Sequence, residues 1–406
     1  MTTTAPRLRM ERVVEGAVST PLELFFDLVF VFALTQVTGY MAHHPNPEGV
    51  IRGLLVLGLL WWSWGSYAWL GNVIKADEGL GRFAVLVAMA AMFVIALAIP
   101  EAFDDAPGGW SSPCTLAVGY LVLRLMHLAA FWALSAGDAG LRNQLRRFSI
   151  AMVPATTLLF VAAGVGGDAR TWIWAAALLS DLGGTWVGGA SGWRLRSATH
   201  FAERHGLIVI IALGESVVAI GVGVSDQPLS GEIVAASLLG LAVSAAMWFV
   251  YFDTSATLAE HALEQAPEED RARLARDAYS YLHLPMVAGI ALGALGLKKV
   301  LEHASGGEGH QLSDPLGTVG INSLVLGVIA YLVGQVAFLC RCGYPVKKHR
   351  LATAIALLPM LAIGRHVSSL TTLGVIAAAL NLMVAWEVWR YAERRRELRH
   401  AGHDHG

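Results

Sequence analysis

Ionisable side chains recur inside stretches of this chain that are otherwise apolar. Asp27 lies within the run Glu23 to Gln36 (E-L-F-F-D-L-V-F-V-F-A-L-T-Q), and Glu215 lies within a second apolar run that begins at His205. Burying an ionisable group in lipid is costly, so such groups point to a function or face a partner. The chemistry that they suggest is the passage of a small ion or polar solute. The candidates for such a path are Asp27, Gln36, Arg124, His127, Asp181, His205, Glu215, His283 and Asn381.

Arg124 lies in the middle of an apolar stretch, three residues before His127, so the two share a helical face. We expect Arg124 to point into the protein toward Asp27, Asp181 or Glu215, because a guanidinium facing lipid is unfavourable. The alternative is a position near one membrane surface, where its side chain snorkels to water.

The three histidine candidates within predicted crossings could change charge near neutral pH. They are His127, His205 and His283. The alternative for each is a hydrogen-bonded interior group without a role in proton transfer.

Motifs for nucleotide, metal or hydrolytic chemistry are missing from the sequence. It contains no G-x-x-x-x-G-K-[ST], H-E-x-x-H, G-x-S-x-G or C-x-x-C pattern. In the helix overlay described below, Asp27 and Glu215 would differ in depth by about 14 Å, too far for a hydrolytic carboxylate pair. We therefore predict no catalytic residue, no metal site and no cofactor, although an enzymatic activity stays open.

The composition indicates a protein embedded in lipid. Hydrophobic residues make up 55% of the 406 residues and charged residues only 15%. Apolar runs recur at about the 20 residues that a helix needs to cross a bilayer. The fold class predicted is all-α, a polytopic integral membrane protein with about twelve crossings. They are expected at 22–40, 53–71, 83–100, 115–135, 148–166, 171–190, 205–223, 233–252, 280–297, 316–339, 351–368 and 370–389.

The basic residues predict an orientation for these crossings. With the N-terminus on the cytoplasmic side, 23 of the 29 Lys and Arg residues fall inside and five outside, with Arg124 within a crossing. Cytoplasmic loops carry this excess in membrane proteins, so both termini are predicted to be cytoplasmic. The first twenty residues lack the features of a cleaved signal, which makes the first crossing the expected targeting signal.

An internal repeat is indicated by an overlay of two segments 179 residues apart. Phe26–Gln36 aligns with His205–Glu215, and Glu215 then falls opposite Gln36. The following crossings correspond in order, which predicts two parallel six-helix repeats related by an axis along the membrane normal. The predicted organisation is a cytoplasmic segment 1–20, a first repeat 21–191, a linker 192–203, a second repeat 204–390 and a basic, His-containing tail 391–406.

These motifs resemble those of the bacterial low temperature requirement A protein family over nearly the whole chain. The resemblance is carried by the Glu23–Gln36 run, the Trp-rich stretch Trp61–Trp69, and E-R-H-G-L-I-V-I-I-A-L-G-E-S at Glu203–Ser216. It implies a polytopic protein of the bacterial cytoplasmic (inner) membrane, with a link to growth in the cold but no settled activity. The first run is also distantly similar to the opening of the lysosomal potassium channel family, although Phe26 replaces a serine there.

The leading hypothesis is a membrane transporter or ion channel for a small ion or solute. Its path would run between the two repeats, with Asp27 and Glu215 as polar elements and Arg124 as their counter-charge. An integral-membrane enzyme acting on a lipid or isoprenoid substrate is the alternative, and a structural or sensory membrane protein is the third. The expected partners are membrane lipid and the transported solute. Nucleic acid is not expected, and a homo-oligomer is compatible with the sequence.

Overall fold

The computed structural model describes residues 13, 16, 18–105, 107–224, 228–306 and 313–390. Regular structure in this part of the chain is helical, and no strand occurs among these residues, so the predicted all-α class is confirmed. The described residues group into two compact units. Unit 1 holds the residues up to Ile211 together with Ala262–Leu284, and unit 2 holds Ala212–His261 together with the residues from Pro285 onward.

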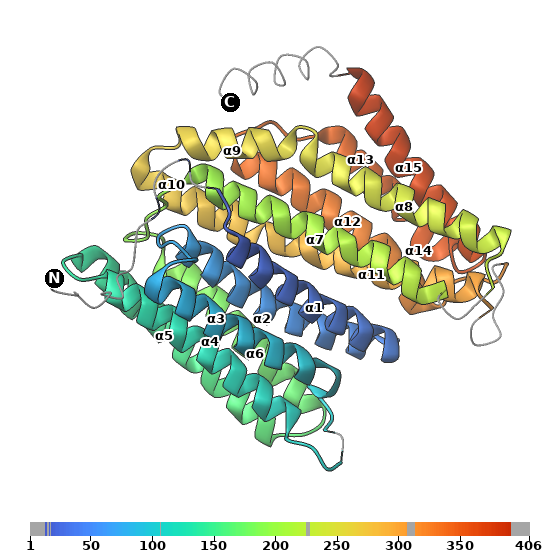
Figure 1. Ribbon diagram of the computed structural model, residues 1–406. Helices are drawn as coiled ribbons and strands as arrows, with labels where there is room; N and C mark the ends of the chain where they lie inside the picture. Colours follow the sequence, from blue (N-terminus) through green and yellow to red (C-terminus); the bar gives the residue numbers. More distant parts are fainter. Residues whose placement is uncertain are drawn as a thin grey trace, which may run out of the picture. The chain divides into compact units, whose positions relative to one another are not determined.

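Unit 1 is a bundle in which six consecutive helices pack against one another (Figure 1). Contacts join α1 to α2 and α3, α4 to α2, α3 and α5, and α6 to α2 and α5. The unit also includes the first half of α7, the end of α9, the short α10 and a π-helix. The bounds are α1 Pro21–His43, α2 Pro47–Gly71, α3 Gly79–Ala98, α4 Ser112–Leu134, α5 Ala139–Gly164, α6 Asp168–Gly188, α7 Ala198–Val224, α9 Ser255–Gln265, α10 Glu268–Leu274 and the π-helix Ala275–Tyr281, with a 3₁₀ turn at Ile99–Glu101.

The start of α1 is fixed by a reciprocal cap between Thr20 and Glu23. The Glu23 amide donates to Thr20 Oγ1 over 3.3 Å, and the Thr20 amide donates to Glu23 Oε2 over 2.9 Å. Two backbone N–H groups that a helix start leaves without partners are thereby satisfied. Pro21 occupies the first turn, where its missing N–H costs nothing. The cap also holds the Glu23 carboxylate in one place.

Unit 2 contains the second half of α7, most of α9 and six further helices, with only the first two residues of α11 lying in unit 1. In unit 2, α8 packs against α12 and α15, while α13 packs against α12 and α15. Helices α11 and α12 approach each other closely because Gly289 of α11 and Gly327 of α12 each face the backbone of the other helix. The bounds are α8 Gly231–Phe252, α11 His283–Ala304, α12 Thr318–Arg341, α13 Lys348–Leu357, α14 Met360–Ile363 and α15 Ser369–Arg390.

Nine helical segments among the described residues are long and apolar enough to cross a membrane. This finding supports a polytopic membrane protein. The segments are Pro21–His43, Gly79–Glu101, Ser112–Leu134, Ala139–Gly164, Ala198–Val224, Gly231–Gln265, Glu268–Ala304, Thr318–Arg341 and Ser369–Arg390. The other three predicted crossings fall on α2, on α6 and on the pair α13 and α14.

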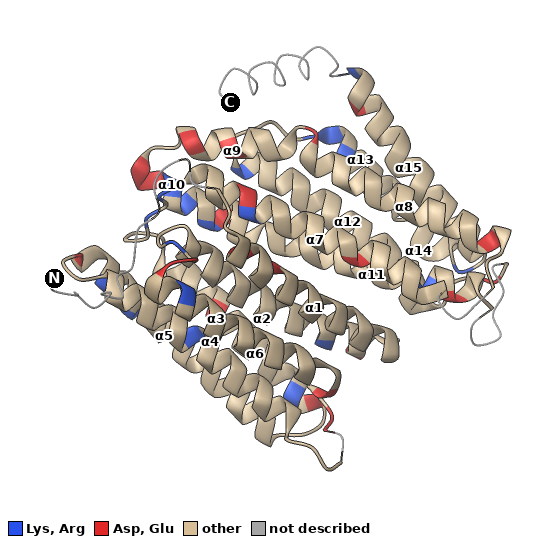
Figure 2. Cartoon of the chain, viewed as in Figure 1, with Lys and Arg blue, Asp and Glu red and all other residues tan. Residues whose placement is uncertain are grey.

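The eleventh predicted crossing, 351–368, is not one continuous helix. It is divided into α13 and α14 by a turn at Leu358 and Pro359. Proline has no backbone N–H to donate to the preceding turn, and its ring displaces that turn, so the helix is interrupted there. Figure 2 shows charged residues concentrated toward helix ends and loops, with a few inside the bundles.

The two-repeat arrangement and its boundaries stay predictions. The first part of α7 belongs to unit 1, although the predicted second repeat begins at residue 204. Most of the predicted cytoplasmic segment 1–20 and the whole basic tail 391–406 lie outside the described residues.

Candidate functional site

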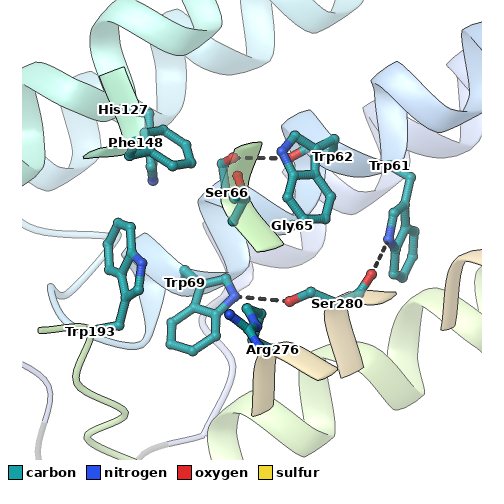
Figure 3. A pocket seen from close by; sticks show the side chains of 11 residues that line it. Trp61, Trp62, Gly65, Ser66, Trp69, His127, Phe148, Trp193, Arg276 and Ser280 are labelled. Carbon is teal, nitrogen blue, oxygen red and sulfur yellow. Dashed lines mark hydrogen bonds between the residues drawn. The ribbon is translucent and has the colours of Figure 1, made fainter. Parts of the chain in front are cut away.

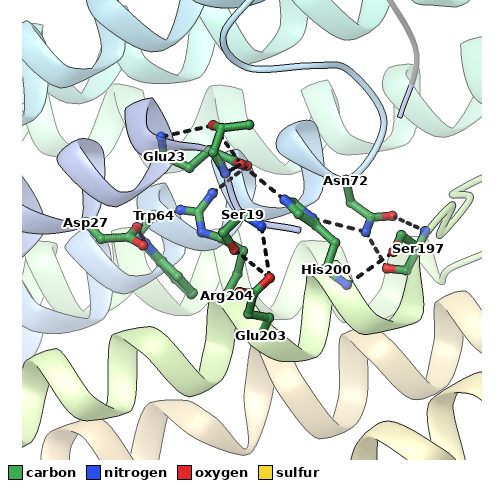
Figure 4. Close-up of polar contacts among 10 residues, drawn as sticks. Ser19, Glu23, Asp27, Trp64, Asn72, Ser197, His200, Glu203 and Arg204 are labelled. Carbon is green, nitrogen blue, oxygen red and sulfur yellow. Dashed lines mark hydrogen bonds and ion pairs between the residues drawn. The ribbon is translucent and has the colours of Figure 1, made fainter. Parts of the chain in front are cut away.

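Two acids on α1 face two bases on α7 within unit 1 (Figure 4). Glu23 and Asp27 are one helical turn apart, as are His200 and Arg204, so each pair lies on one face of its helix. Arg204 Nη1 donates to Glu23 Oε1 over 2.7 Å, and its Nη2 donates to Asp27 Oδ1 over 2.6 Å. One guanidinium therefore bridges both carboxylates. We call Glu23, Asp27, His200 and Arg204 the acid–base cluster.

Asp27 is the innermost member of the acid–base cluster and is fully buried. Its Oδ1 accepts a second hydrogen bond, of 2.7 Å, from the indole Nε1 of Trp64 on α2. Its Oδ2 is buried and has no hydrogen-bond partner among the described residues. A buried carboxylate oxygen without a partner is costly unless it takes up a proton or a ligand. Asp27 thus has a free position for a proton.

The other end of the cluster is held by Asn72 and His200. Asn72 Nδ2 donates to the Ser197 carbonyl over 2.6 Å, and its Oδ1 accepts from the Arg196 amide over 2.7 Å. With the amide fixed this way, Nδ2 faces His200 Nδ1 at 3.5 Å, while His200 Nε2 lies 3.1 Å from Glu23 Oε2. A neutral imidazole that accepts at Nδ1 and donates at Nε2 satisfies both contacts.

Gly71 leaves the space in which Glu23 and Arg204 meet. A Cβ at this position would overlap Glu23 Oε1 and would lie 3.6 Å from Arg204 Nη1. A side chain at position 71 would therefore displace the Glu23 carboxylate from its place beside Arg204.

The formal charges in the acid–base cluster do not balance when His200 is neutral. Two carboxylates then face one guanidinium, which leaves one excess negative charge in a buried site. One added proton, on Asp27 or on His200, would restore neutrality. A small cation could do the same. The cluster can therefore exchange one positive charge without losing the contacts of Arg204.

A second buried ion pair joins α4 to α6. Arg124 Nη2 donates to Asp181 Oδ1 over 2.7 Å, and Nη1 donates to Ser66 Oγ over 2.7 Å. The Tyr120 hydroxyl donates to the other Asp181 oxygen. The guanidinium also lies 4.4 Å from the ring centre of Phe148. Each polar side-chain atom of Arg124 and Asp181 thus has a hydrogen-bond partner, except Arg124 Nε.

Asp181 is one of the three acids expected as the partner of Arg124. The side chains of both residues have no exposed surface, so Arg124 does not snorkel. The sequence hypothesis made Arg124 the counter-charge for the acids of the path. The structure instead gives Asp27 the counter-charge Arg204.

The three candidate histidines are buried in aromatic surroundings of unit 1. His205 Nδ1 lies 2.9 Å from the Phe201 carbonyl, and His283 Nδ1 lies 3.1 Å from that of Ala278. The rings of His205 and His283 are 5.2 Å apart and meet edge to face. His127 differs, because neither ring nitrogen has a hydrogen-bond partner among the described residues.

The remaining candidates are spread over both units. Glu215 is buried and belongs to unit 2. Asn381 Nδ2 donates to the Ala377 carbonyl one turn earlier on α15, over 2.8 Å. Gln36 is partly exposed on α1. Their roles in transport stay predictions.

Glu23, His200 and Arg204 were not among the site residues predicted from the sequence. The signal that could have found them is the i, i+4 spacing of two acids on one helix and of two bases on another. Unit 2 contains a related group of two bases and one acid. There, Arg350 Nη2 donates to Glu387 Oε1 over 2.7 Å, and His349 Nε2 lies 3.1 Å from Glu387 Oε2. No group of three His, Cys, Asp or Glu side chains among the described residues could hold a metal ion.

Comparisons with known proteins place this chain. An uncharacterized protein of Rhizobium meliloti (strain 1021) is 28% identical over 306 residues, which cover 73% of this chain and 72% of that protein. No solved structure matches the chain. Residues 18–385 match the family described as bacterial low temperature requirement A protein. The match covers most of the chain, all four residues of the acid–base cluster and the Arg124–Asp181 pair, and the chain therefore belongs to the bacterial low temperature requirement A protein family.

Proposed function

We propose that this protein is a transporter that moves a small ion or solute across the membrane and uses the acid–base cluster to exchange a proton. The observation that carries the proposal is the charge imbalance around Arg204, where Glu23 and Asp27 share one guanidinium. Desolvated ionisable groups of this kind mark ion pathways and proton relays in membrane proteins. Asp27 is the proposed proton site because its Oδ2 has no partner.

The proposal also includes the location and orientation of the chain. We place the protein in the bacterial cytoplasmic membrane with both termini inside, as the distribution of Lys and Arg predicts. The acid–base cluster then lies toward the cytoplasmic side, because it joins the first two turns of α1 and α7, which both enter from that side in this orientation. Cytoplasmic protons would have the shorter route to Asp27.

Proton flux into liposomes tests this function. The purified protein is reconstituted with a pH-sensitive dye inside, and a potassium gradient with valinomycin supplies the driving force. We expect the wild-type protein to acidify or alkalinise the lumen faster than empty liposomes do. Asp27→Asn should lower the flux to that of empty liposomes, since an amide neither takes up nor releases the proton.

The matched control is Asp270→Asn in α10, where an exposed carboxylate pairs with Arg273 over 2.6 Å. This variant should transport like the wild type. Wild-type flux from a well-folded Asp27→Asn protein would contradict the assigned role. Absence of any flux from the wild-type protein, over several imposed gradients, would contradict proton exchange itself.

A further inference from the structure

A pocket in unit 1 is walled mainly by tryptophans and is separate from the acid–base cluster (Figure 3). Trp61, Trp62 and Trp69 come from α2, and Trp193 comes from the segment between α6 and α7. In Figure 3, Trp193 and His127 lie on the opposite side of the pocket from Trp61 and Ser280. We call this space the tryptophan pocket.

Two of its walls are held rigidly by hydrogen bonds to one serine of the π-helix. Trp61 Nε1 donates to the Ser280 carbonyl over 2.7 Å, and Trp69 Nε1 donates to Ser280 Oγ over 3.0 Å. These two indoles therefore offer no free N–H group to a ligand. They supply shape and an apolar surface.

Four other lining side chains carry buried polar atoms that have no hydrogen-bond partner among the described residues. These atoms are Trp62 Nε1, Thr185 Oγ1, Arg276 Nη1 and both ring nitrogens of His127. Each of the four residues is more than nine-tenths buried. Buried polar groups are nearly always paired with protein, water or a ligand. Because these groups without partners surround one cavity, their arrangement indicates that water or a ligand occupies it.

The chemistry of these groups selects an occupant with acceptor atoms. An indole N–H and a guanidinium N–H can only donate, so Trp62 and Arg276 both require an acceptor. Arg276 is held in place by Asp277, whose Oδ1 accepts from Nε over 2.8 Å and lies 2.7 Å from Nη2. Asp277 does not line the pocket, and none of the described lining residues is acidic. An occupant of the pocket would therefore meet part of the Arg276 guanidinium and no carboxylate.

The size of the pocket restricts the occupant to a few atoms. The cavity has a volume of about 40 Å³. A single water needs roughly 10–15 Å³ of such volume, so the cavity has room for a few waters. A halide or a carboxylate of two or three carbons fits this limit, whereas a lipid headgroup does not.

We propose that the tryptophan pocket binds a small monovalent anion, with Trp62 Nε1 and Arg276 Nη1 as its donors. The Thr185 hydroxyl completes the site, and the aromatic walls exclude larger or strongly hydrated ions. This binding does not depend on the transport function proposed above, and it is measured without any gradient.

Bromide quenching of tryptophan fluorescence tests the proposal on the full-length protein in detergent. Sodium bromide replaces sodium gluconate at constant ionic strength, because gluconate is too large for the pocket. We expect a saturable quenching component in addition to the linear component from exposed indoles. Sodium acetate should abolish the saturable component by competition. Acetamide, which has the shape of acetate without its charge, should not.

Variants then identify the donors by the bromide concentration at half-saturation. Arg276→Gln should raise it by roughly tenfold or more, as expected for losing one hydrogen bond from a charged donor. Thr185→Val, which keeps the shape of the side chain, should raise it less. The matched control is Trp248→Phe, a half-exposed indole of unit 2, which should reduce only the linear component.

Three results would overturn the proposal. Strictly linear quenching of the wild-type protein means that water alone fills the pocket. Equal competition by acetamide and acetate means that the site does not select an anion. An unchanged half-saturation in both Arg276→Gln and Thr185→Val places the anion elsewhere. If Arg276→Gln fails to fold, Thr185→Val and the acetate competition still decide between these outcomes.

Discussion

The Arg124–Asp181 pair offers a direct measurement of what a buried charge contributes to this fold. Both side chains have no exposed surface and lie 2.7 Å apart. Removing one partner leaves the other charge buried without compensation, which costs about 3–5 kcal/mol. Asp181→Leu would leave Arg124 with Ser66 as its one remaining hydrogen-bond partner, and Arg124→Met would leave Asp181 with Tyr120. We expect each single variant to lose about 3 kcal/mol or more of unfolding free energy.

The double variant Arg124→Met/Asp181→Leu should be much less destabilised than the sum of the two single variants. Replacing both charges removes the uncompensated one, so we expect a coupling energy of at least about 2 kcal/mol. The assay is equilibrium unfolding in mixed micelles, followed by tryptophan fluorescence. An exposed pair, Arg273 with Asp270, serves as the matched control and should show a coupling below about 1 kcal/mol.

Additive losses in the Arg124 and Asp181 variants would refute this reasoning. Additivity would mean that water or another group solvates each charge when its partner is removed. The guanidinium would then be less desolvated than its burial indicates.

Three further predictions concern helix packing, topology and the reactivity of a buried thiol. Gly289→Ala should destabilise unit 2 by about 1–3 kcal/mol in the same unfolding assay, because the added Cβ would lie 2.6 Å from the Gly327 carbonyl oxygen. The control is Gly374→Ala, which has open space around the added Cβ and should be neutral or slightly stabilising. A membrane-impermeant maleimide added to spheroplasts should label the exposed Cys114 and spare Cys340 and Cys342 until the membrane is permeabilised, and the reverse pattern would invert the proposed orientation. After permeabilisation, Cys342 should react slowly near pH 7 and faster as pH rises, since burial raises the pKa of its thiol to about 12 and the thiolate is the reactive form. A labelling rate of Cys342 that levels off between pH 7 and pH 9 would contradict this effect of burial, because the thiolate fraction of a thiol with so high a pKa keeps rising through this range.

The sequence predicted helices well because crossing a bilayer requires a long apolar run, which is a local property. The predicted crossing 22–40 falls within α1, which begins at Pro21. The division at Pro359 was also visible in the sequence, but the apolar run continues past it and suggested one crossing. Hydropathy reports where a segment is buried and says little about whether its backbone stays continuous.

Partners across the bundle were harder to predict, because they depend on how each helix is rotated and which neighbours it has. Arg124 was expected to find one of three acids, and only its packing selects Asp181. Glu23 was overlooked because an acid at the first turn of a helix usually needs no explanation beyond capping. Its contacts with Arg204 and His200 depend on the position of α7, which local sequence patterns do not give.

That double use of Glu23 has a mechanical consequence. The same carboxylate closes the first turn of α1 through Thr20 and receives Arg204 and His200 from α7. We therefore expect a change of charge in the cluster to change how often the first turn of α1 opens. Amide hydrogen exchange at Glu23 and Leu24, whose N–H groups bond to Thr20, should accelerate in Arg204→Gln. Protonation of the acid–base cluster and opening of the first turn of α1 would then be coupled.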